Sequence, residues 1–193
     1  MKKLFKVVAV AVLSLGFGVA AQAQTTDNRI QASATVVDAI RVDVGSALSF
    51  GQVTRGVDKY VPMTGPAVSG ASATSQSGVL NGFFEVYAGS GSNVNLTFSP
   101  LSQLMKGSVP LAIDFNKGLS PTGTINTVAW GTVGENSVLT PMVFGSNNIS
   151  NFPAHLIDGT NGVYVYVGGT VRPTADQESG VYTADIILTA TYN

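Results

Sequence analysis

The sequence predicts an all-β fold, an antiparallel β-sandwich, and three observations support this prediction. After the first residues, every strong hydrophobic periodicity has a period of two, as expected for strands that are buried on one face. No stretch shows the apolar spacing of three and four residues that is typical of an amphipathic helix. Turn segments rich in Gly, Pro and Asn separate about eight to ten short predicted strands, which favours a sandwich, with a closed barrel as the alternative.

The first 23 residues are predicted to be a secretory signal peptide. Lys2, Lys3 and Lys6 form a basic start, and an uncharged apolar run covers Val7–Ala20. Ala21–Ala23 is a small-x-small cleavage site. The run is short for a spanning helix of ~20 residues, so a membrane anchor is the weaker alternative. We therefore expect a secreted mature chain that begins near Gln24 and has no membrane span.

The mature chain is expected to begin with an N-terminal extension or first strand over residues 24–37, followed by a β-sandwich domain over residues 38–193. In the extension, apolar residues alternate with polar ones: Ile30, Ala32, Ala34 and Val36. The alternation continues at Ile40, Val42 and Val44, either in phase or after a bulge near Val37-Asp38.

Further strands are expected in order along the domain. They cover residues 48–53, 60–63, 83–87, 94–98, 109–115, 125–133 and 138–144. Gly89–Asn93 is expected to join two of them as a hairpin-type connection. In the strand over 109–115, Leu111, Ile113 and Phe115 should share one face. Residues 145–161 are Asn-rich and are expected to be irregular.

Two strong strands are expected to end the chain. The first covers Gly162–Val171, with a kink at Gly168-Gly169, and a polar loop over 173–180 follows it. The second has apolar residues at every other position: Tyr182, Ala184, Ile186, Leu188, Ala190 and Tyr192. Only Ile187 breaks this alternation, so its side chain should face away from the core. A terminal strand this regular should pair with a neighbour at or near a sheet edge.

No set of residues predicts catalysis, a cofactor or a metal site. The chain has no cysteine, and its single histidine, His155, lies in the irregular segment without a recognisable catalytic partner. The 11 acidic residues are scattered singly and fit solubility better than a carboxylate pair. Asp158–Gly162 lacks most calcium ligands, so a turn is expected there. The net charge of −1 without a basic cluster argues against nucleic acid as a partner.

Both ends of the mature chain resemble fimbrial subunits assembled by the chaperone–usher route. In those subunits a glycine stands fourteenth from the end, alternating apolar residues follow, and a tyrosine is penultimate; Gly180 and Tyr192 hold these positions here. Asn28–Asp38 resembles the start of the cysteine-free, alternate-chaperone pilins of enterobacterial colonisation fimbriae. Residues 28–193 are similar to an uncharacterised family of secreted pilin-like proteins, a domain of unknown function. The matching segments are Ala32–Val36, Leu48–Gly51, Val167–Val171 and Gly180–Asn193.

The resemblance implies an immunoglobulin-like, pilin-like sandwich that a donor strand completes. The implied function is that of a structural subunit of a bacterial surface filament, with a role in adhesion, exported through the periplasm to the cell surface. The implied donor residues are Ile30, Ala32, Ala34 and Val36. The implied surface for a chaperone, an usher or the next identical or related subunit comprises Gly180, Tyr182, Ala184, Ile186, Leu188, Ala190 and Tyr192.

Two questions remain open from the sequence. Ala32 and Ala34 bury little surface, so residues 30–44 could instead be the first strand of this domain itself. The alternative function is a self-complete, secreted, monomeric β-sandwich that binds a carbohydrate or a protein ligand.

Overall fold

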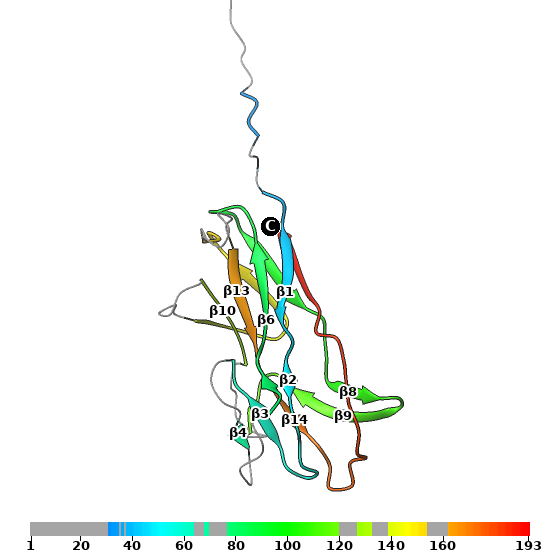
Figure 1. The fold of residues 1–193 in the computed structure, drawn as a ribbon. Helices are drawn as coiled ribbons and strands as arrows, with labels where there is room; N and C mark the ends of the chain where they lie inside the picture. The colour runs from blue at the N-terminus through cyan, green and yellow to red at the C-terminus, as the bar shows by residue number, and fades with distance from the viewer. Residues whose placement is uncertain are drawn as a thin grey trace, which may run out of the picture. The chain divides into compact units, whose positions relative to one another are not determined.

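The computed structural model describes residues 31–34, 36, 38–63, 68–69, 77–119, 127–132, 139–153 and 162–193 (Figure 1). In these ranges the regular secondary structure consists of β-strands, with no helix, and all paired strands are antiparallel. The predicted all-β, antiparallel, sandwich-like fold is therefore confirmed. Residues 36–193 form one compact unit that holds all of these strands. Residues 1–35 form a separate unit, of which only residues 31–34 are described.

The first sheet has five strands in the order β1-β6-β13-β10-β11. Their bounds are β1 Arg41–Ser46, β6 Gly82–Tyr87, β13 Gly162–Val167, β10 Val128–Gly131 and β11 Thr140–Met142. Its inward face carries Val86, Val128, Val163, Val165 and Val167, all buried in the main core. β-branched side chains suit this position because they pack well on a pleated, half-buried surface.

A second sheet of three strands has the order β12-β7-β15. Its strands are β12 Ser146–Ile149, β7 Val94–Phe98 and β15 Leu188–Tyr192. Val94, Leu96 and Phe98 of β7 are buried, while Asn95 and Thr97 point outward. The Phe98 ring meets the Phe84 ring of β6 at 6.4 Å between centroids, so side chains of the two sheets meet in the shared core.

The remaining strands form a five-stranded sheet in the order β4-β3-β14-β9-β8 and the two-stranded pair β2-β5. The bounds are β2 Ser49–Phe50, β3 Lys59–Val61, β4 Val68–Ser69, β5 Val79–Leu80, β8 Gln103–Lys106, β9 Val109–Asp114 and β14 Gly169–Arg172. Leu111, Ile113 and Phe115 are all buried, as the alternation over residues 109–115 predicts.

The chain changes sheet at Gly168, where the sequence predicts a kink. β13 pairs in the first sheet, β14 pairs in the five-stranded sheet, and Gly168 alone separates them. A Cβ at this position would lie 2.2 Å from the backbone oxygen of Val61, so only glycine fits. The predicted single strand is thus two strands that bend from one sheet into another.

The structure corrects three predictions about the elements. The connection Gly89–Asn93 is not a hairpin, because β6 and β7 belong to different sheets and do not pair. The segment 145–161 is not irregular throughout, since β12 lies within it and pairs with β7. The terminal strand is shorter than expected: β15 begins at Leu188, and of the residues before it only Thr183 forms a bridge, with Met105.

Candidate functional site

The terminal strand and the first strand each occupy the end of a sheet. Among the strands that the structure describes, β15 pairs only with β7, and β1 pairs only with β6. The two strands lie next to each other, with no ladder of hydrogen bonds between them (Figure 1). Their facing edges are therefore backbone edges that could pair with a further strand.

A hydrogen-bond network of Tyr192 closes one end of the gap between these edges. The Tyr192 hydroxyl donates to the backbone oxygen of Asp38, just before β1, and accepts from the Gly89 N–H at 2.8 Å. Since β1 begins and β15 ends near this network, the two strands run in opposite directions. Leu188 consequently lies toward the Val44 end of β1.

Val44 marks the opposite end, which is open. It stands directly across from Phe84, which in turn stands across from the fully buried Val165, so all three side chains lie on the inward face. Yet Val44 is 72% exposed, whereas its neighbour Val42 packs partly buried against the core. Among the described residues, therefore, none covers this inward-facing valine, which stands beside the irregularity of the β1–β6 ladder at Val44 and Ser46.

The side chains of the terminal stretch alternate as the sequence predicts, with one departure. Leu188 is buried; Tyr182, Ile186, Ala190 and Tyr192 are half-buried and pack against the core. Ile187 is 53% exposed on the opposite face, as expected for the residue out of phase. Ala184 is exposed, because it lies where the chain has left Met105 of β8 and has not yet joined β7.

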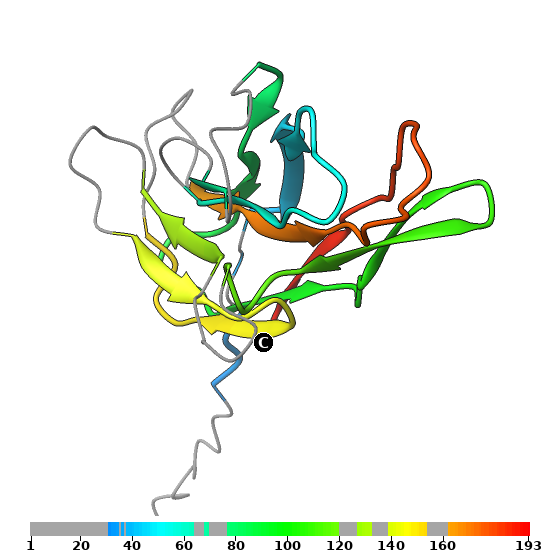
Figure 2. The same ribbon diagram turned by 90° about the horizontal axis from the view of Figure 1, so that it is seen from below.

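The terminal stretch therefore links two sheets. Thr183 exchanges backbone hydrogen bonds of 2.9 and 3.0 Å with Met105, and Ser99 N–H donates to the Ile187 oxygen at 3.0 Å. Figure 2 shows the stretch beside the β8–β9 hairpin before it reaches β7. Its antiparallel neighbour, the chain from β7 to β8, changes sheet at Ser99–Ser102, so the terminal stretch must bend with it.

Gly180 has a local structural reason to be glycine. Its φ is +150°, and a Cβ would lie 2.6–2.9 Å from the end of the Lys106 side chain. Lys106 Nζ lies 2.5 Å from both the Glu178 carboxylate and the Ser179 oxygen. The Tyr182 hydroxyl donates to the Glu178 oxygen at 2.8 Å. These contacts hold the start of the terminal stretch against β8.

The implied donor residues are only partly described. Ile30 lies outside the described residues. Ala32, Ala34 and Val36 are exposed, with Val36 at 95%, and belong to no strand. β1 begins only at Arg41, so the alternative of a continuous first strand over residues 30–44 does not match the described part of the extension.

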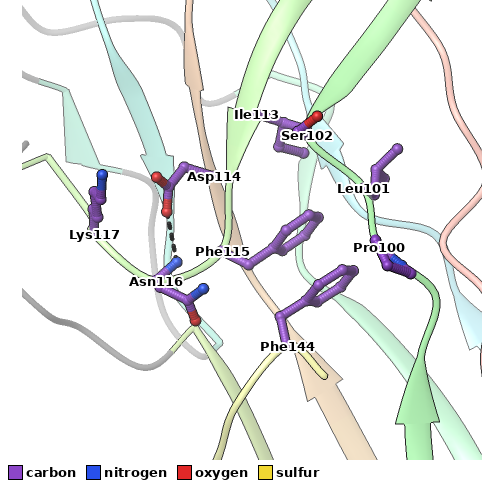
Figure 3. A pocket seen from close by; sticks show the side chains of 9 residues that line it. All are labelled: Pro100, Leu101, Ser102, Ile113, Asp114, Phe115, Asn116, Lys117 and Phe144. Atoms are coloured by element: carbon purple, nitrogen blue, oxygen red, sulfur yellow. Dashed lines mark hydrogen bonds between the residues drawn. The ribbon is translucent and has the colours of Figure 1, made fainter. Parts of the chain in front are cut away.

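An open hollow of about 360 Å³ lies between β9, the β7–β8 connection and Phe144 (Figure 3). The Phe115 and Phe144 rings stack at 3.7 Å and form one wall. Asp114 Oδ1 accepts the Asn116 N–H at 2.7 Å, which makes it a turn-stabilising carboxylate. The hollow thus presents apolar walls with a few polar groups at its rim.

His155 and most of the Asp158–Gly162 turn lie outside the described residues, as does the predicted signal peptide. Among the residues that the structure describes, no group of three His, Cys, Asp or Glu side chains is placed to hold a metal ion. No helix in the same ranges is long and apolar enough to span a membrane.

Comparison with known proteins gives no match: no protein-family model, no curated protein and no solved structure matches this chain.

The exposed, inward-facing Val44 is the feature that the sequence alone did not single out. Its alternation with Val42 predicts the face correctly, but no local pattern predicts that Val44 stays exposed on that face.

Proposed function

We propose that this chain is a structural subunit of a bacterial surface filament, joined to the next subunit by donor-strand exchange. In this proposal the N-terminal extension of one molecule inserts between β1 and β15 of another. The observation that supports it most is Val44, which is exposed on the inward face beside the edges of β1 and β15, and no described strand pairs with these edges. A strand added there would cover Val44 and pair both edges.

Side-chain burial and backbone hydrogen bonds would both contribute favourable free energy to such an insertion. Burying Ile30 and Val36 would contribute about 1.5–3 kcal/mol each, and the two alanines much less. Each backbone hydrogen bond to the edges would add a net ~0.5–1.5 kcal/mol. Because the donor side chains of the described part, Ala32, Ala34 and Val36, are exposed, they are available to a partner.

The proposal extends to export and assembly. An uncovered apolar edge favours aggregation, so a subunit in transit through the periplasm would need a chaperone strand at the same place. The usher and the next identical or related subunit would then replace it, and the finished filament would stand on the cell surface, where adhesion is a further proposed role. The terminal strand, with Leu188 and Tyr192 inward, would border this place on one side.

A cysteine cross-link tests the donor site directly, because the natural chain has no cysteine. Val44→Cys is combined with Ile30→Cys or Val36→Cys in cells that export the protein, and surface material is oxidised and run on a non-reducing gel. We expect a ladder of disulfide-linked oligomers with at least one pair. The matched control is Val181→Cys in place of Val44→Cys, since Val181 is an 81% exposed valine away from the edge.

Three results would decide against the proposal. They are the absence of a ladder with both pairs, an equal ladder with the Val181 control, and filaments that persist after deletion of residues 24–36. A monomer with an internal cross-link would instead show that the extension inserts into its own domain.

The alternative function, a self-complete secreted monomer that binds a ligand, has one supporting observation. The Tyr192 network already joins the ends of β1 and β15, and Leu188 is buried without any added strand. Size-exclusion chromatography of the purified mature chain separates the two functions. A stable monomer that stays soluble without a chaperone would favour the alternative.

A further inference from the structure

The outward face of the first sheet carries a cluster of aromatic rings. Phe83 of β6 stands directly across from Tyr166 of β13, and Tyr164 is the next outward residue on β13. The Phe83 ring lies 5.4 Å from the Tyr164 ring and 6.1 Å from the Tyr166 ring, and the two tyrosines are 6.0 Å apart. All three side chains are half-exposed, on the face opposite the buried valines. We call Phe83, Tyr164 and Tyr166 the aromatic platform; Figure 1 shows β6 and β13 side by side.

Glycines next to the rings leave room for them, because a glycine has no side chain that would rise from the sheet at these positions. A Cβ on Gly45 would lie 1.9 Å from the Phe83 ring, so that ring lies directly over the β1 backbone. A Cβ on Gly162 would lie 2.9 Å from the Tyr87 ring, which covers the start of β13 in the same way. Gly131 stands across from Tyr164 and adds no side chain. The rings therefore cover backbone, with no side chain beneath these contacts.

Charged groups border the platform and hold one another in place. Arg41 lies over the Tyr87 ring at 4.0 Å, and its Nε is 2.9 Å from Asp43. The Tyr87 hydroxyl donates to Glu85 at 2.5 Å, and this hydrogen bond raises the pKa of Tyr87. Glu85 stands directly between Asp43 and Tyr164 across the three strands. The border is thus a pre-arranged set of hydrogen-bond donors and acceptors next to apolar rings.

We propose that the aromatic platform and its border, Arg41, Asp43 and Glu85, form a binding site for a neutral oligosaccharide. A sugar ring has an apolar C–H face and a rim of hydroxyls, and this surface offers the complement of both. Tyrosine rings supply contact area at low cost in conformational entropy and can hydrogen-bond through their hydroxyls. Carboxylates and a guanidinium, each able to bind two hydroxyls, would fix the orientation of the sugar.

The charge of the border selects a neutral ligand. Asp43 and Glu85 together outnumber Arg41, which is already paired with Asp43. An acidic sugar would meet net negative charge here, and like charges at close range oppose binding. A protein ligand is the less favoured occupant, because the platform is small and its border is charged rather than apolar. This site does not depend on filament assembly, since it lies on the outward face of β1, β6 and β13. The proposed donor side chains would instead enter the inward face.

The test is titration of the isotopically labelled mature chain with neutral hexasaccharides from cellulose, chitin, xylan and mannan, followed by NMR. We expect one of them, at millimolar concentration or below, to shift the signals of Tyr166, Tyr164 and Phe83. Tyr166→Ala should weaken that binding about five- to tenfold, the loss expected for one aromatic contact. Tyr60→Ala is the matched control, because Tyr60 is a half-buried tyrosine on β3, in another sheet, and its removal should leave the affinity unchanged.

Glu85→Gln separates recognition from folding, since it keeps the shape of the side chain and removes its charge. It should weaken binding of the neutral sugar while the thermal midpoint changes little. The proposal is overturned if no neutral hexasaccharide shifts the platform signals, or if Tyr60→Ala weakens binding as much as Tyr166→Ala. It is also overturned if, in a parallel titration, an acidic hexasaccharide shifts these signals and no neutral one does. Signals that shift only with protein concentration would overturn it as well, because they would identify a contact between copies of the chain.

Discussion

Gly168→Ala should destabilise the fold at the point where the chain passes from one sheet to the next. The added Cβ would lie 2.2 Å from the oxygen of Val61, 2.8 Å from the carbonyl carbon of Pro62 and 3.0 Å from the nitrogen of Met63. All three are backbone atoms, so no side-chain rotation can relieve the overlap. Overpacking of this kind costs about 1–3 kcal/mol, and the entropy that alanine removes from the unfolded chain offsets only ~0.4–1 kcal/mol.

The measurement is urea unfolding followed by the fluorescence of Trp130, together with a thermal melt. For a domain of this size, 1 kcal/mol corresponds to roughly 2–4 °C in Tm. Gly145→Ala is the matched control, because the nearest atom to its Cβ is a side-chain carbon of Val143 at 3.8 Å and its φ is not positive. Equal stability of the two variants would contradict this reasoning, because it would mean that the backbone of residues 61–63 leaves room for a Cβ at position 168.

Three further changes test other parts of the fold. Burial lowers the pKa of Lys59, so the unfolded chain binds more protons between that lowered pKa and the ordinary lysine pKa, and stability should rise with pH in this window. Lys59→Met should abolish the rise, as measured by urea midpoints from neutral to alkaline pH against the natural chain. Tyr192→Phe removes the hydrogen bond to Asp38 and should cost about 1 kcal/mol, with faster amide exchange in the Gly89 turn. Gly180→Ala should cost about 1–3 kcal/mol because of its positive φ, and Lys106→Ala in the same chain should not restore the melting temperature.

The sequence predicts strands best where one face is buried and the other is not. Over residues 83–87, 94–98 and 109–115 the expected strands match β6, β7 and β9 closely. The last two have apolar residues at alternate positions, and the first is rich in aromatic residues, which favour strands. β12 was missed because its side chains are Ser146, Asn147 and Asn148, with only Ile149 buried. A short strand with one inward apolar residue has no detectable period.

Strand partners could not be predicted from local patterns. Gly91 has a positive φ of 78° within a turn, as a hairpin would require, yet the two strands it follows and precedes diverge into different sheets. A turn residue reports only the local backbone, whereas sheet membership depends on which distant strands cover each edge. The Gly168-Gly169 pair was predicted as a kink, but its role as a change of sheet depends on the approach of Val61, more than a hundred positions earlier.

The same distinction explains the candidate donor site. The alternation at Val42 and Val44 predicts an inward face, and the terminal alternation predicts the buried Leu188, but the space between β1 and β15 is a property of neither segment. Its shape also bears on the two alanines of the extension. At the Tyr192 end the half-buried Ala190 and Tyr192 already cover the core, so in the proposed assembly small side chains suffice there.

At the open end, Val44 needs a larger partner, and only Ile30 or Val36 of the proposed donor can supply one. From its first to its last Cα, β15 spans about 14 Å, whereas the four alternate donor residues from Ile30 to Val36 span about 20 Å. One of the two bulky residues must therefore lie beyond β15, while the other packs on Val44. The pair that cross-links to Val44→Cys would then establish the direction in which the donor strand runs.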